Sequence, residues 1–177
     1  MPNYLLPFKP GDKVLEVGGG DRPQFHPNLD VREGPGVDIV CDLNEPLPIE
    51  SEIYDGVFGM YIIEHISWRR VRHFISETHR VLRPGGVTVQ ITANLLEQAR
   101  QLVETPEWND SLVCQIFGDN DYPENTHRCG FSPAYATKLF REAGFHEVTI
   151  FEHPCPTDMI IQAKKSGARI VRRLGER

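Results

Sequence analysis

Three acidic residues are associated with three successive short apolar segments near the start of the chain. Glu16 lies inside the apolar run 13–17, which is followed by glycines at 18–20. Asp30 falls at the end of the second run, and Asp42 follows the third. The carboxyl ends of parallel strands meet at one edge of an α/β sheet, where such sheets bind ligands. Glycine there lets a ligand approach the main chain without a side chain in the way. A carboxylate after the second strand can accept hydrogen bonds from both hydroxyls of a ribose, so the pattern predicts a site for a ribose-containing ligand.

The residues around the third acid suggest that the ligand also carries a nucleobase. Asp42 can contact an exocyclic amine, and Leu43 beside it can flank an adenine ring. Taken singly, the glycines are also explained by a strand-ending turn, and aspartates are common in turns for structural reasons. Three acids after three successive strands are harder to explain by chance, and we favour the functional interpretation.

Short apolar runs alternate with longer segments of helical periodicity, which indicates an α/β protein. We expect strands at 13–17, 28–31, 37–41, 54–61, 87–92, 146–152 and 159–164, and helices at 65–82, 95–104, 108–117 and 133–143. Strands that alternate with helices form a mostly parallel sheet. The last two strands are joined by a turn too short for a crossover helix, so they should pair antiparallel. The predicted fold is a Rossmann-like, mostly parallel sheet with helices on both faces and a C-terminal antiparallel β-hairpin.

Over residues 12–164 the sequence resembles the class I S-adenosylmethionine-dependent methyltransferases, and it is most similar to the small bacterial group related to the methyltransferase domain 11 type. The resemblance is carried, in order, by VLEVGGG, LDV, VDIVCDLNEPLP, YDGVFGMYIIEHI, HRVLRPGG and FS…EAGF. It implies S-adenosyl-L-methionine as cofactor. The matching positions would place the methionine end at Glu16, Gly18 and Gly20, the ribose at Asp30, the adenine at Asp42 and Leu43, and the sulfonium above Gly59, Met60 and Tyr61.

The glycine motif departs from the family pattern at its third position, where Arg22 stands in place of glycine and is followed by Pro23. The segment between the first and second strands is long enough for only a short first helix. Arg22 is either a cationic partner for the methionine carboxylate or a surface arginine, and both interpretations stay open.

Methyl transfer from a sulfonium needs alignment of donor and acceptor, and it needs a general base only when the acceptor begins protonated. His65 and His127 are the candidate catalytic residues. The polar loop 118–130 is long for a compact domain, so we expect it to close over the acceptor and His127 to orient or deprotonate it. A surface loop with incidental polar residues is the alternative, and packing or capping explains His65 equally well. We identify no metal site, because His127, Cys129 and His153 lack metal-ligand spacing.

Composition limits the class of partner. The chain has 177 residues and a net charge of −6, but residues 164–177 hold six basic residues and one acid. We expect a methyltransferase domain over 1–165 and a basic tail over 166–177. An acidic body makes nucleic acid an unlikely partner. The resemblance to the methyltransferases implies a small polar or sugar-containing molecule as the acceptor. Without a membrane-spanning run or a secretory signal, the expected location is the cytoplasm. The oligomeric state is not indicated.

Two other functions fit the same fold class. An NAD-dependent oxidoreductase would favour G-x-G-x-x-G, but the corresponding last position is Pro23, and it would favour an all-parallel sheet. A non-catalytic protein that binds S-adenosylmethionine without turnover would keep the same cofactor motifs.

Overall fold

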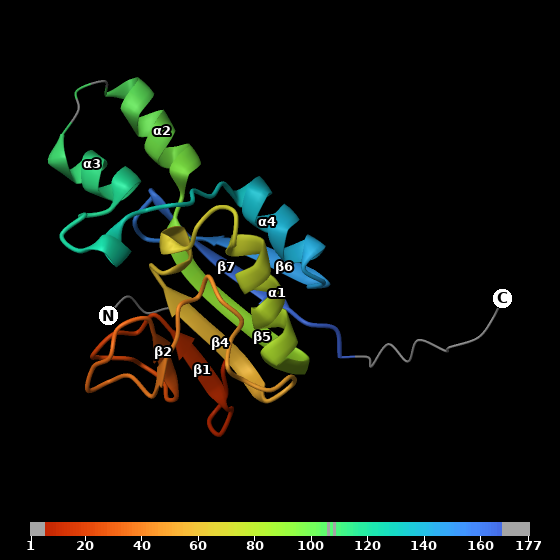
Figure 1. Cartoon of the computed structure of the whole chain (residues 1–177). Coiled ribbons are helices and arrows are strands. Elements are labelled where there is room, and N and C mark those ends of the chain that lie inside the picture. The colour runs from red at the N-terminus through yellow and green to blue at the C-terminus, as the bar shows by residue number, and fades with distance from the viewer. Residues whose placement is uncertain (1–5, 106, 108, 168–177) are drawn as a thin grey trace.

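One seven-stranded sheet organises the described part of the chain, which comprises residues 6–105, 107 and 109–167 of this computed structural model (Figure 1). The strand order is β3-β2-β1-β4-β5-β7-β6. The strands are β1 (Val14–Val17), β2 (Asn28–Asp30), β3 (Ile39–Val40), β4 (Tyr54–Met60), β5 (Leu82–Ala93), β6 (Glu147–Glu152) and β7 (Asp158–Lys164). The α-helices are α1 (Val71–Val81), α2 (Leu95–Glu104), α3 (Asp110–Phe117) and α4 (Pro133–Glu142), and two 3-10 turns are η1 (Ile63–His65) and η2 (Pro123–Asn125).

Strand direction confirms the predicted Rossmann-like, mostly parallel sheet with a C-terminal antiparallel hairpin. Strands β1 to β5 pair in parallel, whereas β7 pairs antiparallel with both β5 and β6. The connection between β6 and β7 is only 153–157, so the C-terminal hairpin forms as expected. In the part of the chain that the structure describes, no helix is long and apolar enough to cross a membrane.

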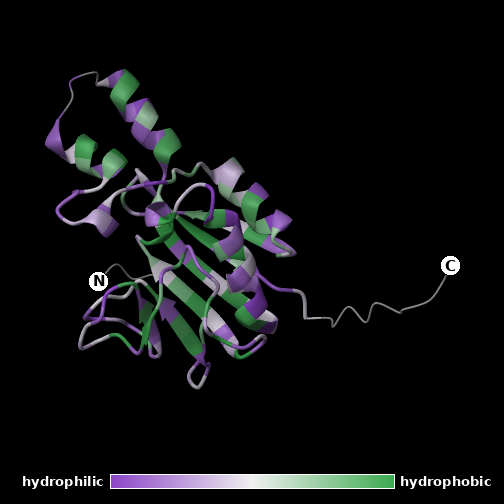
Figure 2. Cartoon of the chain, viewed as in Figure 1, coloured by the Kyte–Doolittle hydropathy of each residue, from purple (hydrophilic) through white to green (hydrophobic). Residues whose placement is uncertain are grey.

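The two faces of the sheet are covered differently. On one face, α1 and α4 contribute Phe74, Ile75, Leu139 and Phe140 to the main apolar core. On the other, Phe58 and Val89 belong to a smaller cluster covered by Leu6, Phe8 and Phe25. Figure 2 shows the resulting pattern, with apolar strands in the centre and helices that alternate between apolar and polar positions. Among the described residues, segments outside the helices therefore complete the second face.

The helix predicted at 65–82 begins later, because other segments satisfy the backbone donors before it. The Ser67 amide donates to the Asn44 side chain, and the Trp68 amide donates to the Arg128 carbonyl. The helix α1 then begins at Val71 and ends at Val81, and β5 begins directly at Leu82, five residues earlier than expected. Residues 61–70 thus form a connection after the carboxyl end of β4 that is held by hydrogen bonds to other segments and contains no α-helix.

The carboxyl ends of β1, β2, β4 and β5 lie at one edge of the sheet, and α2 and α3 extend beyond that edge (Figure 1). The segment between α3 and α4, which contains η2, returns across it. From residue 168 on, the expected basic tail lies outside the described residues.

Candidate functional site

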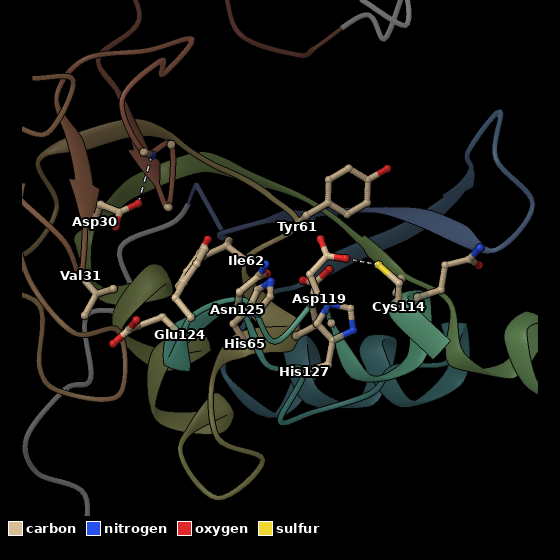
Figure 3. Close-up of a pocket in the computed structure, with 18 of the residues that line it drawn as sticks. Asp30, Val31, Tyr61, Ile62, His65, Cys114, Asp119, Glu124, Asn125 and His127 are labelled. Atoms are coloured by element: carbon tan, nitrogen blue, oxygen red, sulfur yellow. Dashed lines mark hydrogen bonds between the residues drawn. The ribbon is translucent and has the colours of Figure 1, made fainter. Parts of the chain in front are cut away.

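Two adjoining cavities lie at the carboxyl edge of the sheet. The smaller has a volume of about 130 Å³ and is named the Asp42 pocket, and the larger has a volume of about 490 Å³ and is named the chamber. Both are lined by Gly18, Asp30, Val31, Ile62, His65 and Glu124, so they form one continuous cleft. Figure 3 shows Asp30 and Val31 on one side of the cleft and His65, Asp119 and His127 on the other. The predicted position of the site is therefore where the fold has its cleft.

Asp30 lies where the two cavities meet. Its side chain is largely buried, and its two carboxylate oxygens accept backbone N–H bonds from Gly20 and Arg32, each at 3.0 Å. A carboxylate has about four lone-pair sites, so these two bonds leave capacity for further donors in the cleft. Asp30 thus links the glycine loop, residues 18–20, to the end of β2 and can still bind hydroxyl groups.

The Asp42 pocket contains the third acid and its neighbour. Asp42 and Leu43 both line it, together with Val31 and Ile62. Leu43 is buried and also packs in the main core, which fixes its position. Asp42 is held by its own turn, because its Oδ1 accepts the Asn44 backbone N–H at 2.8 Å. The pocket therefore has apolar side walls and an acidic rim at Asp30 and Asp42.

The glycine loop lines both cavities and needs glycine for steric reasons. Gly18 has a φ of +72°, and a Cβ there would lie 2.3 Å from the Ile62 side chain. Gly20 also has a positive φ of +55° and lines the chamber. A ligand in the cleft can therefore approach exposed main chain at this loop.

Four residues proposed from the sequence do not line either cavity. The carboxylate of Glu16 is buried and accepts the backbone N–H groups of Gln24 and Phe25 at 2.6 and 2.7 Å, so it holds the loop that replaces a first helix. Burial raises the pKa of this carboxyl. The Arg22 side chain is exposed. A Cβ on buried Gly59 would meet Gln90, and Met60 is an exposed residue next to the cleft.

The chamber brings Tyr61, His65 and His127 together, as the sequence predicts. The two imidazole rings meet edge to face with centroids 4.8 Å apart. Burial lowers the pKa of both histidines, and the proximity of His127 lowers that of His65 further. Neutral imidazoles near neutral pH can accept a proton or orient an acceptor.

Glu64 is a chamber residue whose role sequence reasoning missed. The residue is only 1% exposed and lines the chamber. One carboxylate oxygen accepts the Thr92 hydroxyl at 2.9 Å, and the other, Oε1, is buried with no hydrogen-bond partner. Burial raises the pKa of Glu64 to about 7. The isoleucines at 62, 63 and 66 were the signal that this acid would be buried.

Asp158 is a second acid that the sequence did not single out. It begins β7, lines the chamber, and accepts the Tyr61 hydroxyl at 2.8 Å. Burial and this bond to a carboxylate raise the pKa of Tyr61, so its hydroxyl stays protonated and donates. The contact joins the connection after β4 to the C-terminal hairpin.

The loop 118–130 forms one wall of the chamber. Six of its residues line it: Gly118, Asp119, Tyr122, Glu124, Asn125 and His127. The backbone N–H groups of Arg128 and Cys129 both donate to the Glu64 carbonyl, which attaches the end of the loop to η1. At the opposite side, the Arg32 guanidinium lies 4.0 Å from the centre of the Tyr122 ring. The loop thus spans the chamber between β2 and β4.

Residues 26–90 match a family model described as a methyltransferase domain. The match covers less than half of the chain, and it includes Asp30, Asp42, Leu43, Glu64 and His65. No curated protein sequence matches this chain.

Solved structures of methyltransferases share the fold. A S-adenosylmethionine-dependent methyltransferase from Thermotoga maritima is 17% identical with a TM-score of 0.63, over 92% of this chain and 84% of that one. One from Archaeoglobus fulgidus is 16% identical with a TM-score of 0.63, over 87% and 86%. Phosphoethanolamine N-methyltransferase 2 from Haemonchus contortus, in complex with S-adenosyl-L-methionine, is 13% identical with a TM-score of 0.62, over 90% and 50%.

The family match and the shared fold confirm the resemblance to the class I S-adenosylmethionine-dependent methyltransferases, and they support S-adenosyl-L-methionine as the cofactor.

Proposed function

We propose that this protein, which has the class I methyltransferase fold, transfers a methyl group from S-adenosyl-L-methionine to a small polar acceptor bound in the chamber. The observation that supports this most is the position of Asp30. It lies between the glycine loop and the pocket of Asp42 and Leu43, at the point where that pocket opens into the chamber. One cleft thus offers a site for a nucleoside and an adjoining space for a second molecule.

The residues of the cleft fit this cofactor chemically. Asp30 would bind the ribose hydroxyls, Leu43 and Val31 would contact the adenine, and Asp42 would accept from its amine. The exposed backbone at Gly18 and Gly20 would face the methionine end, with Tyr61 beside it. S-adenosyl-L-methionine supplies an already activated methyl group, so the work of the protein is alignment, which is worth up to about 7–11 kcal/mol.

The acceptor would be bound by the groups that line the chamber from the loop 118–130. In this proposal His127 orients the acceptor, and with His65 it offers a neutral imidazole able to take a proton. The stacking of Arg32 on Tyr122 would hold the loop across the cleft while the acceptor is bound. Sugar-containing and other polar small molecules remain in the candidate set.

Isothermal titration calorimetry tests the cofactor assignment directly. S-adenosyl-L-methionine and S-adenosyl-L-homocysteine should bind the wild-type protein, and NAD should not. Heat from NAD alone would overturn the proposal in favour of an oxidoreductase. A protein that binds both sulfur nucleotides but transfers no label to any class of acceptor would be the non-catalytic binding module.

A further inference from the structure

The charged side chains of the chamber are predominantly acidic. Five carboxylates line it, against one arginine, and they are Asp30, Glu64, Asp119, Glu124 and Asp158. The guanidinium of Arg32 is stacked on Tyr122 at the edge of the chamber. The two histidines have lowered pKa values and add little positive charge near neutral pH. A molecule bound here therefore meets a negative field, which favours a cation and opposes a carboxylate.

Several of these acids already have partners within the protein. Asp30 holds two backbone amides, Asp119 accepts from the Cys114 thiol at 2.9 Å, and Asp158 accepts the Tyr61 hydroxyl. Glu64 differs from them, because its Oε1 is fully buried and has no donor. Leaving a buried acceptor unsatisfied costs about 1–3 kcal/mol, so the geometry indicates that a donor is missing.

The groups around Glu64 explain why the protein does not supply that donor. Thr92 on β5 uses its hydroxyl on the other oxygen, and Asp158 on β7 adds a like charge. The backbone N–H groups of Glu64 itself and of Ala93 also approach the carboxylate and partly offset the rise of its pKa, but neither forms a hydrogen bond to Oε1. The amides of Arg128 and Cys129 bind the Glu64 carbonyl and not its side chain. Across the described ranges, no lysine or arginine forms an ion pair with Glu64.

We propose that the acceptor is a small cationic amine and that Glu64 binds its nitrogen and removes a proton from it, with Asp158 contributing negative charge at the same end of the chamber. This inference rests on the proposed function and narrows its acceptor to one chemical class. An ammonium group supplies both the donor that Oε1 lacks and the charge that compensates the acids. A neutral alcohol supplies the donor but leaves the charge uncompensated.

The proton must leave before the nitrogen can react, because an ammonium has no free electron pair. The Glu64 carboxylate takes one proton from the ammonium, which leaves a neutral amine and a neutral carboxyl group. The nitrogen electron pair then forms a bond to the methyl carbon as the carbon–sulfur bond breaks. The pair from that bond stays on sulfur, and the positive charge moves to the methylated nitrogen. Because burial raises the pKa of Glu64 to about 7, the carboxyl group can hold the proton near neutral pH.

The acids could instead serve the positive groups of the cofactor itself, and the Glu64→Gln variant separates the two roles. If Glu64 binds the acceptor, this variant should bind S-adenosyl-L-homocysteine within about twofold of wild type, while kcat/KM for an amine falls by about 100-fold or more. Glu50→Gln is the matched control, because Glu50 is exposed and precedes β4, at the far edge of the sheet. A large loss of nucleotide affinity in Glu64→Gln, with amine kinetics otherwise unchanged, would overturn the inference.

The experiment begins with the wild-type protein and needs no identified substrate. Labelled S-adenosyl-L-methionine is offered with ethanolamine, histamine and 2-phenylethylamine, each beside the alcohol of the same skeleton, and with small carboxylates. In parallel, calorimetry measures binding of each amine and alcohol to the protein saturated with S-adenosyl-L-homocysteine. We expect label transfer to at least one amine, and tighter binding of amines than of their alcohols.

The outcomes separate this inference from the proposed function. Transfer to alcohols or carboxylates alone, or no preference for amines in either measurement, overturns the amine assignment while the methyltransferase proposal stands. Failure to bind either sulfur nucleotide overturns the proposed function itself. Should Glu64→Gln not fold, Asp158→Asn provides the second variant, for which we expect a smaller but selective loss of amine binding.

Discussion

Replacement of Glu64 by glutamine should change how the stability of the apo protein depends on pH. Burial raises the pKa of this carboxyl to about 7, against an ordinary value of 4.5. The folded state therefore binds the proton more tightly than the unfolded chain does. The resulting stabilisation is fully present below the unfolded pKa and is lost as pH rises through the folded pKa. Glutamine does not titrate, so the variant should lack this loss.

The magnitude follows from the difference between the two pKa values. Each pKa unit corresponds to about 1.4 kcal/mol, so ionisation of Glu64 costs about 3 kcal/mol at about pH 8.5 and under about 1 kcal/mol at about pH 5. Relative to wild type, Glu64→Gln should therefore gain about 2.5 kcal/mol in free energy of unfolding between these pH values. For a domain of this size, that corresponds to about 5–10 °C in melting temperature.

Urea denaturation of wild type, Glu64→Gln and Glu50→Gln at the two pH values measures this difference. The exposed control should follow wild type at both. The contributions of groups that titrate alike in the compared proteins cancel when the difference is taken. If the pH profiles of wild type and Glu64→Gln are parallel, Glu64 has an ordinary pKa, and the reasoning from its burial is refuted.

Three further outcomes are expected. Asp30→Ala should weaken binding of S-adenosyl-L-homocysteine by about tenfold or more in calorimetry. Because the substitution leaves two backbone N–H groups without their acceptor, it should also lower the free energy of unfolding of the apo protein by about 1–3 kcal/mol. Unchanged affinity would show that Asp30 is not part of the binding site. His127→Ala should reduce the methyl-transfer rate by about 10²–10⁴-fold at nearly constant cofactor affinity. The control variant His146→Ala, which changes an exposed histidine, should not reduce that rate. Normal turnover by His127→Ala would rule out the proposed role of His127. A chain ended after Gly167 should fold and bind cofactor as wild type does, because β7 is complete by then, and circular dichroism would reveal a failure.

The structure changes one expectation about Asp30 itself. The sequence assigns the carboxylate only to the ribose hydroxyls, and on that basis its removal would cost affinity and leave the melting temperature of the apo protein nearly unchanged. The carboxylate also holds the amides of Gly20 and Arg32, so part of its role is to shape the empty site. Calorimetry and denaturation together distinguish the two contributions.

The sequence by itself was sufficient for the seven strands along the chain, the terminal hairpin, and the placement of Asp30, Asp42 and Leu43 at one edge. These features depend on local patterns, because strand periodicity and the ends of strands can be read from a few neighbouring residues. The cofactor follows from the same local motifs, as does the expectation that the loop 118–130 lies at that edge.

Only the tertiary structure decided how the remaining acids are used. Both Glu16 and Glu64 lie among apolar residues in the sequence, but their roles differ. Glu16 accepts hydrogen bonds from two backbone N–H groups of a loop, whereas Glu64 is a buried residue that lines the chamber. The burial of Glu64 requires Thr92, Asp158 and the end of the loop 118–130, which are distant along the chain. A carboxylate's pKa and its free lone pairs depend on which distant groups approach it, and that approach is set by folding and not by local sequence.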